Sequence, residues 1–242
     1  MAVEGKQRAR VLPVRAVLFD LDGTLADTAP DLAGALNRVR HARGLDPLPL
    51  EQLRNHASHG ARGLLAAGLA MDKSHAEFET VRDAFLDHYA QALCVETVLF
   101  AGTDEVLAEI ARRGLKWGIV TNKASRFTLP LLERLTLHTR AGAVISGDTT
   151  PQSKPHPGPL LAAAAMLDVE PRDCVYVGDA ERDVAAGRAA GMRTLIARYG
   201  YIHTDEAPDA WLADGSLDSI TEVLEWLPAD AAASASERSA AL

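Results

Sequence analysis

Short apolar runs, each ending at a small or polar residue, alternate with helical patterns along most of this chain, and this alternation limits the possible folds more than any other feature. The runs cover VRAVLFD (14–20), LKWGIVT (115–121), AGAVIS (141–146), DCVYVGD (173–179) and RTLIA (193–197). Continuous β-rich apolar runs are typical of strands that are buried on both faces of a parallel sheet. The sequence therefore predicts an α/β fold with a doubly wound parallel sheet built from βαβ units.

The segments between these strands carry helix signals at both ends. In TDEVLAEIARRG, Thr103 is the predicted N-cap, acidic residues fill the first turn, arginines fill the last, and Gly114 is the stop. HPGPLLAAAAMLDV and ERDVAAGRAAG predict helices after the third and fourth strands.

Residues 28–100 interrupt the alternation, because no strand pattern is found there. Thr28 and Asp31 predict a capping box at a first helix. A later apolar stripe repeats every three or four residues, which favours core packing over a ligand-lining role, at Phe78, Val81, Phe85, Tyr89 and Leu93. We therefore expect a small all-helical cap (28–100) inserted after the first strand of a catalytic core (13–27 and 101–227).

Composition excludes several classes of protein. The chain has 33 acidic and 25 basic residues and a net charge of −8, which argues against binding to nucleic acid or to an anionic membrane. No apolar run approaches the ~20 residues that span a bilayer, and the N-terminus has no secretory pattern. Cys94 and Cys174 lack metal-site spacing, which predicts buried free thiols. We expect a cytoplasmic monomer or homodimer with flexible tails at 1–12 and 228–242.

Polar side chains gather where the predicted strands end. In an open parallel sheet, ligands bind outside the carboxyl ends of the strands. The residues that lie there, or on the loop after the third strand, are Asp20, Asp22, Thr121, Asn122, Lys123, Ser146, Asp148, Lys154, Asp179 and Asp183. Each motif alone could be a turn, a strand end, a solvated loop or a helix cap. The four motifs LDGTL, VTNK, SKPHPGP and GDAERD, found in this order and each at the end of a strand or on the loop after it, together favour a functional site.

Such a cluster of carboxylates needs compensating positive charge. Two unit charges about 4 Å apart repel by about 4 kcal/mol at an effective dielectric constant of 20. No His or Cys cluster accompanies the acids, so a hard, oxygen-preferring ion is indicated, with Mg²⁺ favoured over Ca²⁺. A metal ion, a lysine, and hydroxyl and amide donors together form a site for a phosphoryl group.

These motifs resemble those of the haloacid dehalogenase (HAD) superfamily, whose core is Rossmann-like. The matching segments are DLDGT (20–24), VTN with Thr121, SKPHPGP with Lys154, and GDAERD (178–183). The resemblance implies that Asp20 attacks phosphorus. It also implies that Asp22 exchanges a proton with the leaving oxygen and then with water, helped by acidic neighbours that favour its protonated form.

The same resemblance implies the remaining site residues. Thr121 and Asn122 would bind phosphate oxygens, and Lys154 would steady both the nucleophile and the phosphate. Mg²⁺ would be held by Asp20, the backbone carbonyl of Asp22 and Asp179, with Asp183 as a ligand or as support for one.

The substrate is expected to be a small phosphomonoester. An acid at position 22 favours phosphatases over dehalogenases, and the helical insertion resembles the cap of the phosphoglycolate phosphatase group. WGIVTNKASRF and RYGYIHTDEAPDAW look more like the N-acetylmuramic acid 6-phosphate phosphatases, with 2-phosphoglycolate phosphatase as the alternative. Arg62, in SHGARGL, is a candidate clamp for a substrate carboxylate, or else a solvated surface residue. A phosphosugar mutase and a regulator without turnover stay open as less favoured alternatives.

Overall fold

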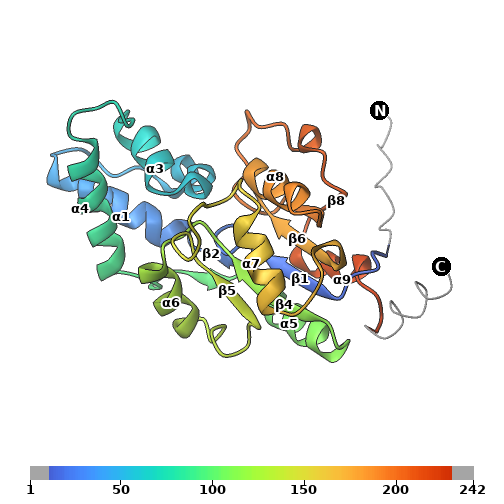
Figure 1. The fold of residues 1–242 in the computed structure, drawn as a ribbon. Coiled ribbons are helices and arrows are strands. Elements are labelled where there is room, and N and C mark those ends of the chain that lie inside the picture. Colours follow the sequence, from blue (N-terminus) through green and yellow to red (C-terminus); the bar gives the residue numbers. More distant parts are fainter. Residues whose placement is uncertain (1–10, 231–242) are drawn as a thin grey trace, which may run out of the picture.

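The computed structural model describes residues 11–230 and contains one six-stranded parallel sheet (Figure 1). The strands lie in the order β5 (Ala143–Ile145), β4 (Lys116–Val120), β1 (Ala16–Phe19), β6 (Cys174–Gly178), β7 (Arg193–Ala197) and β8 (Gly215–Leu217). The doubly wound α/β prediction is confirmed, and all five predicted strands are present. Strand β8 was not predicted, because GSL is too short and too polar to give an apolar run.

Both faces of the sheet are covered. Along β1, Val17 and Phe19 join one core cluster, and Ala16 and Leu18 join another; all four are completely buried. The first cluster includes helix α5 (Thr103–Arg112) and the second includes α7 (Gly158–Met166). Burial on both sides explains why β1 reads as a continuous apolar run instead of an alternating one.

The other helices beside the sheet continue the predicted alternation of strands and helices. They are α6 (Ser125–Arg134), α8 (Glu181–Ala189) and α9 (Val223–Trp226), with short 3₁₀ turns at Pro171–Asp173, Pro208–Trp211 and Ile220–Glu222. One predicted cap is wrong. Gly102 is the N-cap of α5, in a left-handed conformation (φ 88°), and the Thr103 hydroxyl donates to the carbonyl of Leu25 at 3.4 Å. Glycine tolerates this backbone conformation better than threonine does.

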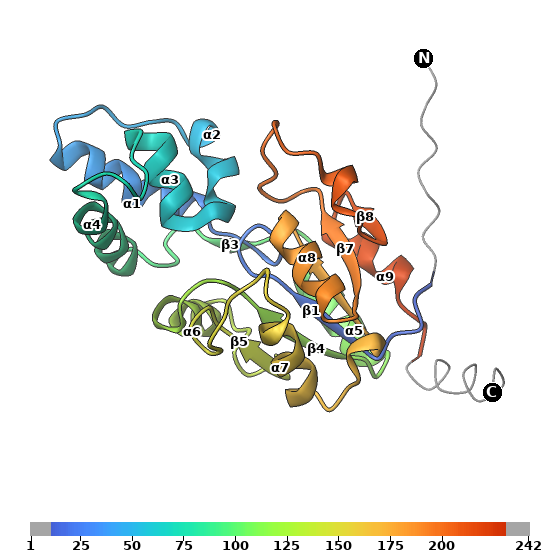
Figure 2. The ribbon, with the colours of Figure 1, turned by 45° about the horizontal axis from the view of Figure 1, so that its top comes forward.

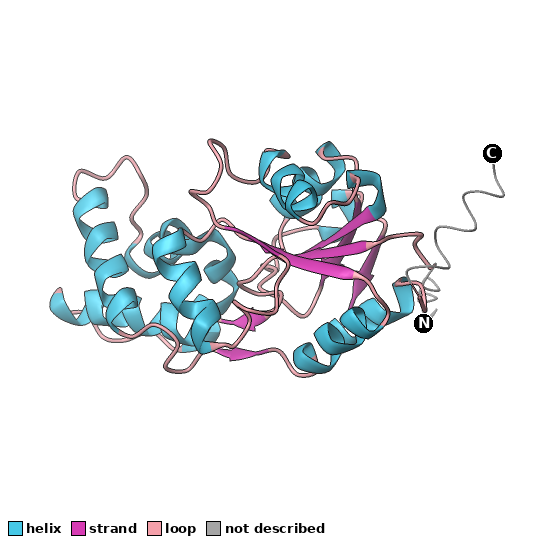
Figure 3. Cartoon of the chain, turned by 60° about the horizontal axis from the view of Figure 1, so that its bottom comes forward, coloured by secondary structure: helices cyan, strands magenta, loops and turns pink. Residues whose placement is uncertain are grey.

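A separate group of helices stands at one end of the sheet, as Figures 2 and 3 show. We call these the cap helices: α1 (Ala29–Ala42), α2 (Leu50–Leu53), the 3₁₀ helix η1 (Arg54–His59), α3 (Gly60–Leu69) and α4 (Phe78–Gln91). The apolar stripe of α4 is buried as expected, including Leu93 just beyond the helix. The domain limits 28–100, 13–27 and 101–227 stay a prediction.

The cap segment is not wholly helical. Strand β3 (Val98–Leu99) pairs antiparallel with β2 (Ala26–Asp27), where the chain leaves and re-enters the sheet layer. The expectation of no strand in 28–100 is therefore wrong at Val98–Leu99. Two-residue strands have no detectable period, and this pairing joins positions about 70 residues apart.

The predicted capping box is also wrong. Thr28 is the N-cap residue of α1, but its hydroxyl donates to Asp22 Oδ1 at 2.5 Å and makes no cap bond. The Asp31 carboxylate accepts three backbone N–H groups, from Val95, Glu96 and Thr97, and so ties α1 to the end of the cap segment. The Tyr201 hydroxyl accepts the N–H groups of Thr28 and Ala29 instead, at 2.7 and 3.0 Å.

Most residues of the predicted tails lie outside the described range. Within it, Leu12 is buried and its N–H donates to the carbonyl of Trp226 at 2.7 Å, and Pro228 is also buried. The predicted tails are therefore too long at these two positions. Between residues 11 and 230, no helix combines the length and the apolar character needed to cross a membrane.

The two cysteines differ in burial. Both are free; Cys174 is buried, whereas Cys94 is only half-buried, so the prediction of two buried thiols holds for Cys174 alone. Burial raises the pKa of Cys174 to about 12, so its thiolate is scarce at pH 8. We expect iodoacetamide at pH 8 to label Cys174 slowly in the native protein and rapidly in urea, as measured by mass spectrometry. Rapid native labelling of Cys174 would contradict this burial.

Candidate active site

The carboxyl ends of β1 and β6 bring the acidic residues together. Asp20 directly follows β1, Asp179 directly follows β6, and Asp183 lies in the first turn of α8. Two glycines permit this approach: a Cβ at Gly23 (φ 77°) would lie 2.1 Å from Asp179 Oδ2, and one at Gly178 would lie 2.5 Å from Cβ of Asp183. The glycines are therefore required by close packing around the carboxylates.

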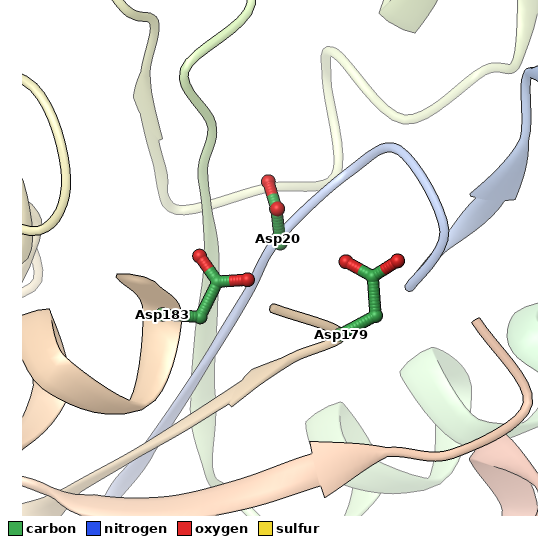
Figure 4. A group of neighbouring side chains, drawn as sticks. All are labelled: Asp20, Asp179 and Asp183. Atoms are coloured by element: carbon green, nitrogen blue, oxygen red, sulfur yellow. The ribbon is translucent and has the colours of Figure 1, made fainter. Parts of the chain in front are cut away.

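Asp20, Asp179 and Asp183 form a buried triad (Figure 4). Each offers a carboxylate oxygen, and these oxygens all lie within 4.8 Å of one another. Asp179 Oδ2 accepts the N–H of Tyr201 at 2.8 Å, while Asp179 Oδ1 has no hydrogen-bond partner among residues 11–230. Burial, followed by the charges of Asp20 and Asp183, raises the pKa of Asp179 to about 7. Burial also raises the pKa of Asp20, and Lys154 opposes that shift.

The triad fits a hard divalent cation. All three ligands are carboxylates, no His or Cys takes part, and Asp179 leaves one buried oxygen without a partner. Oxygen-only donor sets of this kind suit Mg²⁺ or a similar ion. The side chain of Asp22 does not belong to this group. The predicted contribution of its backbone carbonyl stays a prediction.

Lys154 lies between Asp20 and Asp183, and its side chain is completely buried. Its Nζ is 3.0 Å from Asp20 Oδ1 and 2.9 Å from Asp183 Oδ1. It also donates to the carbonyl of Val120 at 2.9 Å and to the Tyr176 hydroxyl at 2.6 Å. The ammonium group is thus held in place from several sides, and it links the predicted nucleophile to Asp183.

Asn122 positions the backbone that carries Lys154. Its Oδ1 accepts the N–H of Lys154 at 3.0 Å, and its Nδ2 donates to the carbonyl of Lys154 at 2.9 Å. This pairing engages both ends of the amide. Its predicted contact with a phosphate oxygen stays a prediction, as does that of the buried Thr121 at the end of β4.

Asp22 contacts Lys123, for which no role was predicted from the sequence. Lys123 Nζ lies 2.8 Å from Asp22 Oδ1, which also accepts the Thr28 hydroxyl. The acidic neighbours expected around Asp22 are therefore not its direct partners. The Lys123 side chain is itself buried and lies over the ring of Tyr89 at 4.8 Å. The sequence signal that could have identified Lys123 as a site residue is its position directly after Thr121 and Asn122 at a strand end.

Arg182 is a second missed cation. It lies between the triad members Asp179 and Asp183 in sequence, and the negative charges of Asp183 and Asp20 raise its pKa against the effect of burial. Its guanidinium donates to the carbonyl of Ser58 at 2.9 Å, and the Ser58 hydroxyl donates to Asp179 Oδ2 at 2.7 Å. The 3₁₀ helix η1 of the cap is thereby bound directly to the site.

These contacts correct the charge argument made from sequence. Lys123 pairs with Asp22, Lys154 pairs with Asp20 and Asp183, and the charges of Asp183 and Asp20 raise the pKa of the nearby Arg182. Much of the negative charge is thus balanced by the chain itself. The metal hypothesis rests on the geometry of the triad and on its oxygen without a partner, and not on charge alone.

A cavity of about 640 Å³ lies between the cap helices and the end of the sheet. The predicted residues among its lining are Asp20, Asp22, Arg62, Thr121, Asn122 and Lys154. Asp179 and Asp183 are buried beside Asp20. Arg62 is exposed and lies in the first turn of α3. Phe85 and Tyr89 of α4 also line this cavity, so the apolar stripe serves core packing and the cavity wall together.

Comparisons with known proteins identify the family of this chain. Residues 17–197 match the family model described as haloacid dehalogenase-like hydrolase. The chain is 40% identical to the N-acetylmuramic acid 6-phosphate phosphatase of Pseudomonas aeruginosa, over 88% of this chain and 95% of that one. It is 42% identical to a phosphoglycolate phosphatase of Xanthomonas campestris, over 89% and 96% of the two chains.

A solved structure confirms the fold. A predicted phosphoglycolate phosphatase from Haemophilus somnus superposes with a TM-score of 0.77 at 24% identity, covering 88% of this chain and 97% of that one. This level of identity supports the fold alone, whereas the curated relatives support the reaction class. The chain belongs to the haloacid dehalogenase-like hydrolase family, among its phosphomonoester hydrolases.

Proposed function

We propose that this protein is a Mg²⁺-dependent phosphatase that acts through an aspartyl-phosphate on a small, carboxylate-bearing phosphomonoester, most favourably N-acetylmuramic acid 6-phosphate. The observation that carries the proposal is the position of Asp20: it lines the cavity and lies 3.0 Å from a buried lysine. Asp22 lines the same cavity two residues later. A nucleophile and a proton donor therefore face one space in which a phosphoryl group could lie.

The reaction divides between these two carboxylates. Asp20 attacks phosphorus as the bond to the leaving oxygen breaks, while Asp22 gives that oxygen a proton. Asp22 then takes a proton from water as the water oxygen attacks the aspartyl-phosphate and releases inorganic phosphate. Lys154 keeps Asp20 in position and stabilises negative charge on the phosphoryl oxygens. Bound Mg²⁺, held by Asp20, Asp179 and Asp183, would offset the charge of the phosphoryl group.

Relatives of both names match this chain, and the size of the cavity supports the larger of the two substrates. A volume of about 640 Å³ lies in the middle of the range of sites that enclose drug-sized ligands. 2-Phosphoglycolate, with two carbons, would leave most of this space to water, whereas a phosphorylated amino sugar would use it. The Pseudomonas aeruginosa relative carries the name of an N-acetylmuramic acid 6-phosphate phosphatase. Both candidate substrates offer a carboxylate that Arg62 can bind.

Phosphate release from the two substrates tests the proposal. We expect kcat/KM to be several tens-fold higher for N-acetylmuramic acid 6-phosphate than for 2-phosphoglycolate. The reverse preference would support the alternative substrate. Formation of glucose 6-phosphate without free phosphate, from β-glucose 1-phosphate with a trace of bisphosphate, would instead identify a mutase.

Metal dependence has a separate readout. EDTA is expected to reduce phosphate release to background, and Mg²⁺ in excess is expected to restore it. In the absence of substrate, Mg²⁺ at 100 times its dissociation constant should stabilise the native state by about 2.7 kcal/mol, measured as a rise in Tm. Asp179→Asn should abolish most of this stabilisation, because it replaces a ligand of the triad. An unchanged response to Mg²⁺ in Asp179→Asn would exclude the triad as the metal site.

A further inference from the structure

The cavity wall contains an arginine that the proposed reaction does not use. Arg126 lies in the first turn of α6, three residues after Lys123, and is exposed to the cavity. Its guanidinium carbon lies 4.6 Å from the centre of the Phe127 ring. A guanidinium stacked on an aromatic ring loses little conformational freedom, and its N–H groups stay available in the plane.

Arg126 differs from the other cations of the site in its partners. Lys123 pairs with Asp22, Lys154 pairs with Asp20 and Asp183, and Arg182 donates to the backbone of Ser58. For Arg126 and Arg62, residues 11–230 supply no ion-pair partner. The carboxylate of Asp148, whose pKa Arg126 helps to lower, already accepts the N–H and the hydroxyl of Ser125.

The same cavity holds a further polar side chain. Tyr89 is buried and lines the cavity, and Lys123 Nζ lies 4.8 Å from the centre of its ring. The Lys123 ammonium is therefore shared between Asp22 and Tyr89, which leaves the arginines as the cations available to a substrate. The cavity therefore combines a phosphoryl site with further polar groups for the rest of a substrate.

We propose that Arg126, together with Arg62, binds the substrate carboxylate and so determines specificity for phosphomonoesters that carry one. This inference rests on the proposed function and adds to it a residue from the sheet layer. Arg62 belongs to the cap helix α3 and Arg126 to α6, so a carboxylate bound by both would join the two sides of the cavity. In a chain of net charge −8, two arginines of this kind give an anionic group a local binding site.

The test uses two substrates that differ in the carboxylate. N-acetylmuramic acid 6-phosphate and N-acetylglucosamine 6-phosphate share the phosphorylated amino sugar, and only the first carries the lactyl carboxylate. Arg126→Met, which keeps an unbranched apolar stem and removes the guanidinium, is expected to lower kcat/KM about tenfold to a hundredfold for the first substrate, mainly through KM, and less than about threefold for the second. Arg126→Lys should restore part of the preference.

Arg112→Met is the matched control. It removes the same charge from an exposed arginine on α5 that pairs with Glu109 and does not line the cavity, so both substrates should keep their wild-type kcat/KM. An equal loss for both substrates in Arg126→Met would overturn the inference while leaving the phosphatase proposal intact. A larger loss on a sugar bisphosphate than on the carboxylate substrate would also overturn it, because the arginines would then bind a second phosphate.

Binding measurements test the role of Arg126 independently of turnover. In an Asp20→Asn background, calorimetry should find N-acetylmuramic acid 6-phosphate bound about tenfold or more tightly than N-acetylglucosamine 6-phosphate. Adding Arg126→Met should remove that difference. A difference that persists would overturn the role of Arg126. Absence of hydrolysis in the wild type, with the binding difference present and sensitive to Arg126, would overturn the proposed reaction alone.

Discussion

The Asp20→Asn variant is expected to release phosphate about four orders of magnitude more slowly than the wild type, with its fold unchanged. An amide is a poor nucleophile towards phosphorus, so no aspartyl-phosphate can form at this position. The neighbouring Asp22 is not expected to replace it, because Lys123 and Thr28 hold its Oδ1 and the proposed reaction already uses it for proton transfer. Phosphate release under substrate saturation, and acid-stable trapping of radiolabelled phosphate on the wild type alone, would measure the effect.

The fold of Asp20→Asn should survive for an identifiable reason. Asp20 Oδ1 accepts the N–H of Leu21 at 2.8 Å, and an amide oxygen can accept the same bond. Burial already raises the pKa of Asp20, so loss of its negative charge removes an unfavourable group. Asp148→Asn is the control, because it makes the same change at an exposed residue on the loop after β5, outside the cavity lining. Activity retained in Asp20→Asn would reject the nucleophile assignment.

The Lys154→Met variant is expected to lose about 3–5 kcal/mol of unfolding free energy as well as its activity. Lys154 is completely buried and pairs with Asp20 and Asp183, so its removal leaves two buried carboxylates without their cation. Urea unfolding followed by circular dichroism gives the change in midpoint. Lys73→Met, at an exposed lysine of the cap segment, should shift the midpoint by less than about 0.5 kcal/mol. Equal stability of the two variants would contradict a structural role for the Lys154 ammonium.

The buried acids also make the folding stability of the metal-free protein depend on pH. The pKa of Asp179 rises from 3.8 to about 7 on folding, so the native state keeps a proton that the unfolded state releases. The contribution of Asp179 to stability is therefore full below about pH 4 and declines as the pH rises towards 7. We expect Mg²⁺ to reduce this decline by binding the ionised form. A stability in EDTA that rises across this pH range, after allowance for other groups, would contradict the assignment.

The sequence could predict that the site residues lie close together, because a parallel topology places the carboxyl ends of neighbouring strands at one edge of the sheet. Asp20 after β1, Thr121 after β4 and Asp179 after β6 illustrate this, since the central strands β4, β1 and β6 lie side by side. Lys154 could be included through its motif, although its complete burial between Asp20 and Asp183 could not be foreseen. Local sequence thus identified most of the residues that lie together at this edge.

Contacts between distant segments explain the failures. The predicted capping partners Thr28 and Asp31 bind Asp22 and the chain at 95–97 instead, because stronger partners arrive from elsewhere in the fold. Lys123, Arg182 and Ser58 have ordinary sequence environments, and their roles follow from contacts with Asp22 and Asp179 made only when the cap helices meet the sheet.

By itself, the sequence determined the parallel sheet and the family of chemistry, because apolar runs report burial and the residues that end them share one edge of the sheet. The tertiary structure alone decided which cation balances which carboxylate, how η1 reaches Asp179, and that Arg62 and Arg126 share one cavity. The physical reason is the sequence distance between interacting residues. Strand and helix patterns depend on a few neighbouring residues, whereas ion pairs form between side chains that folding brings together from distant positions.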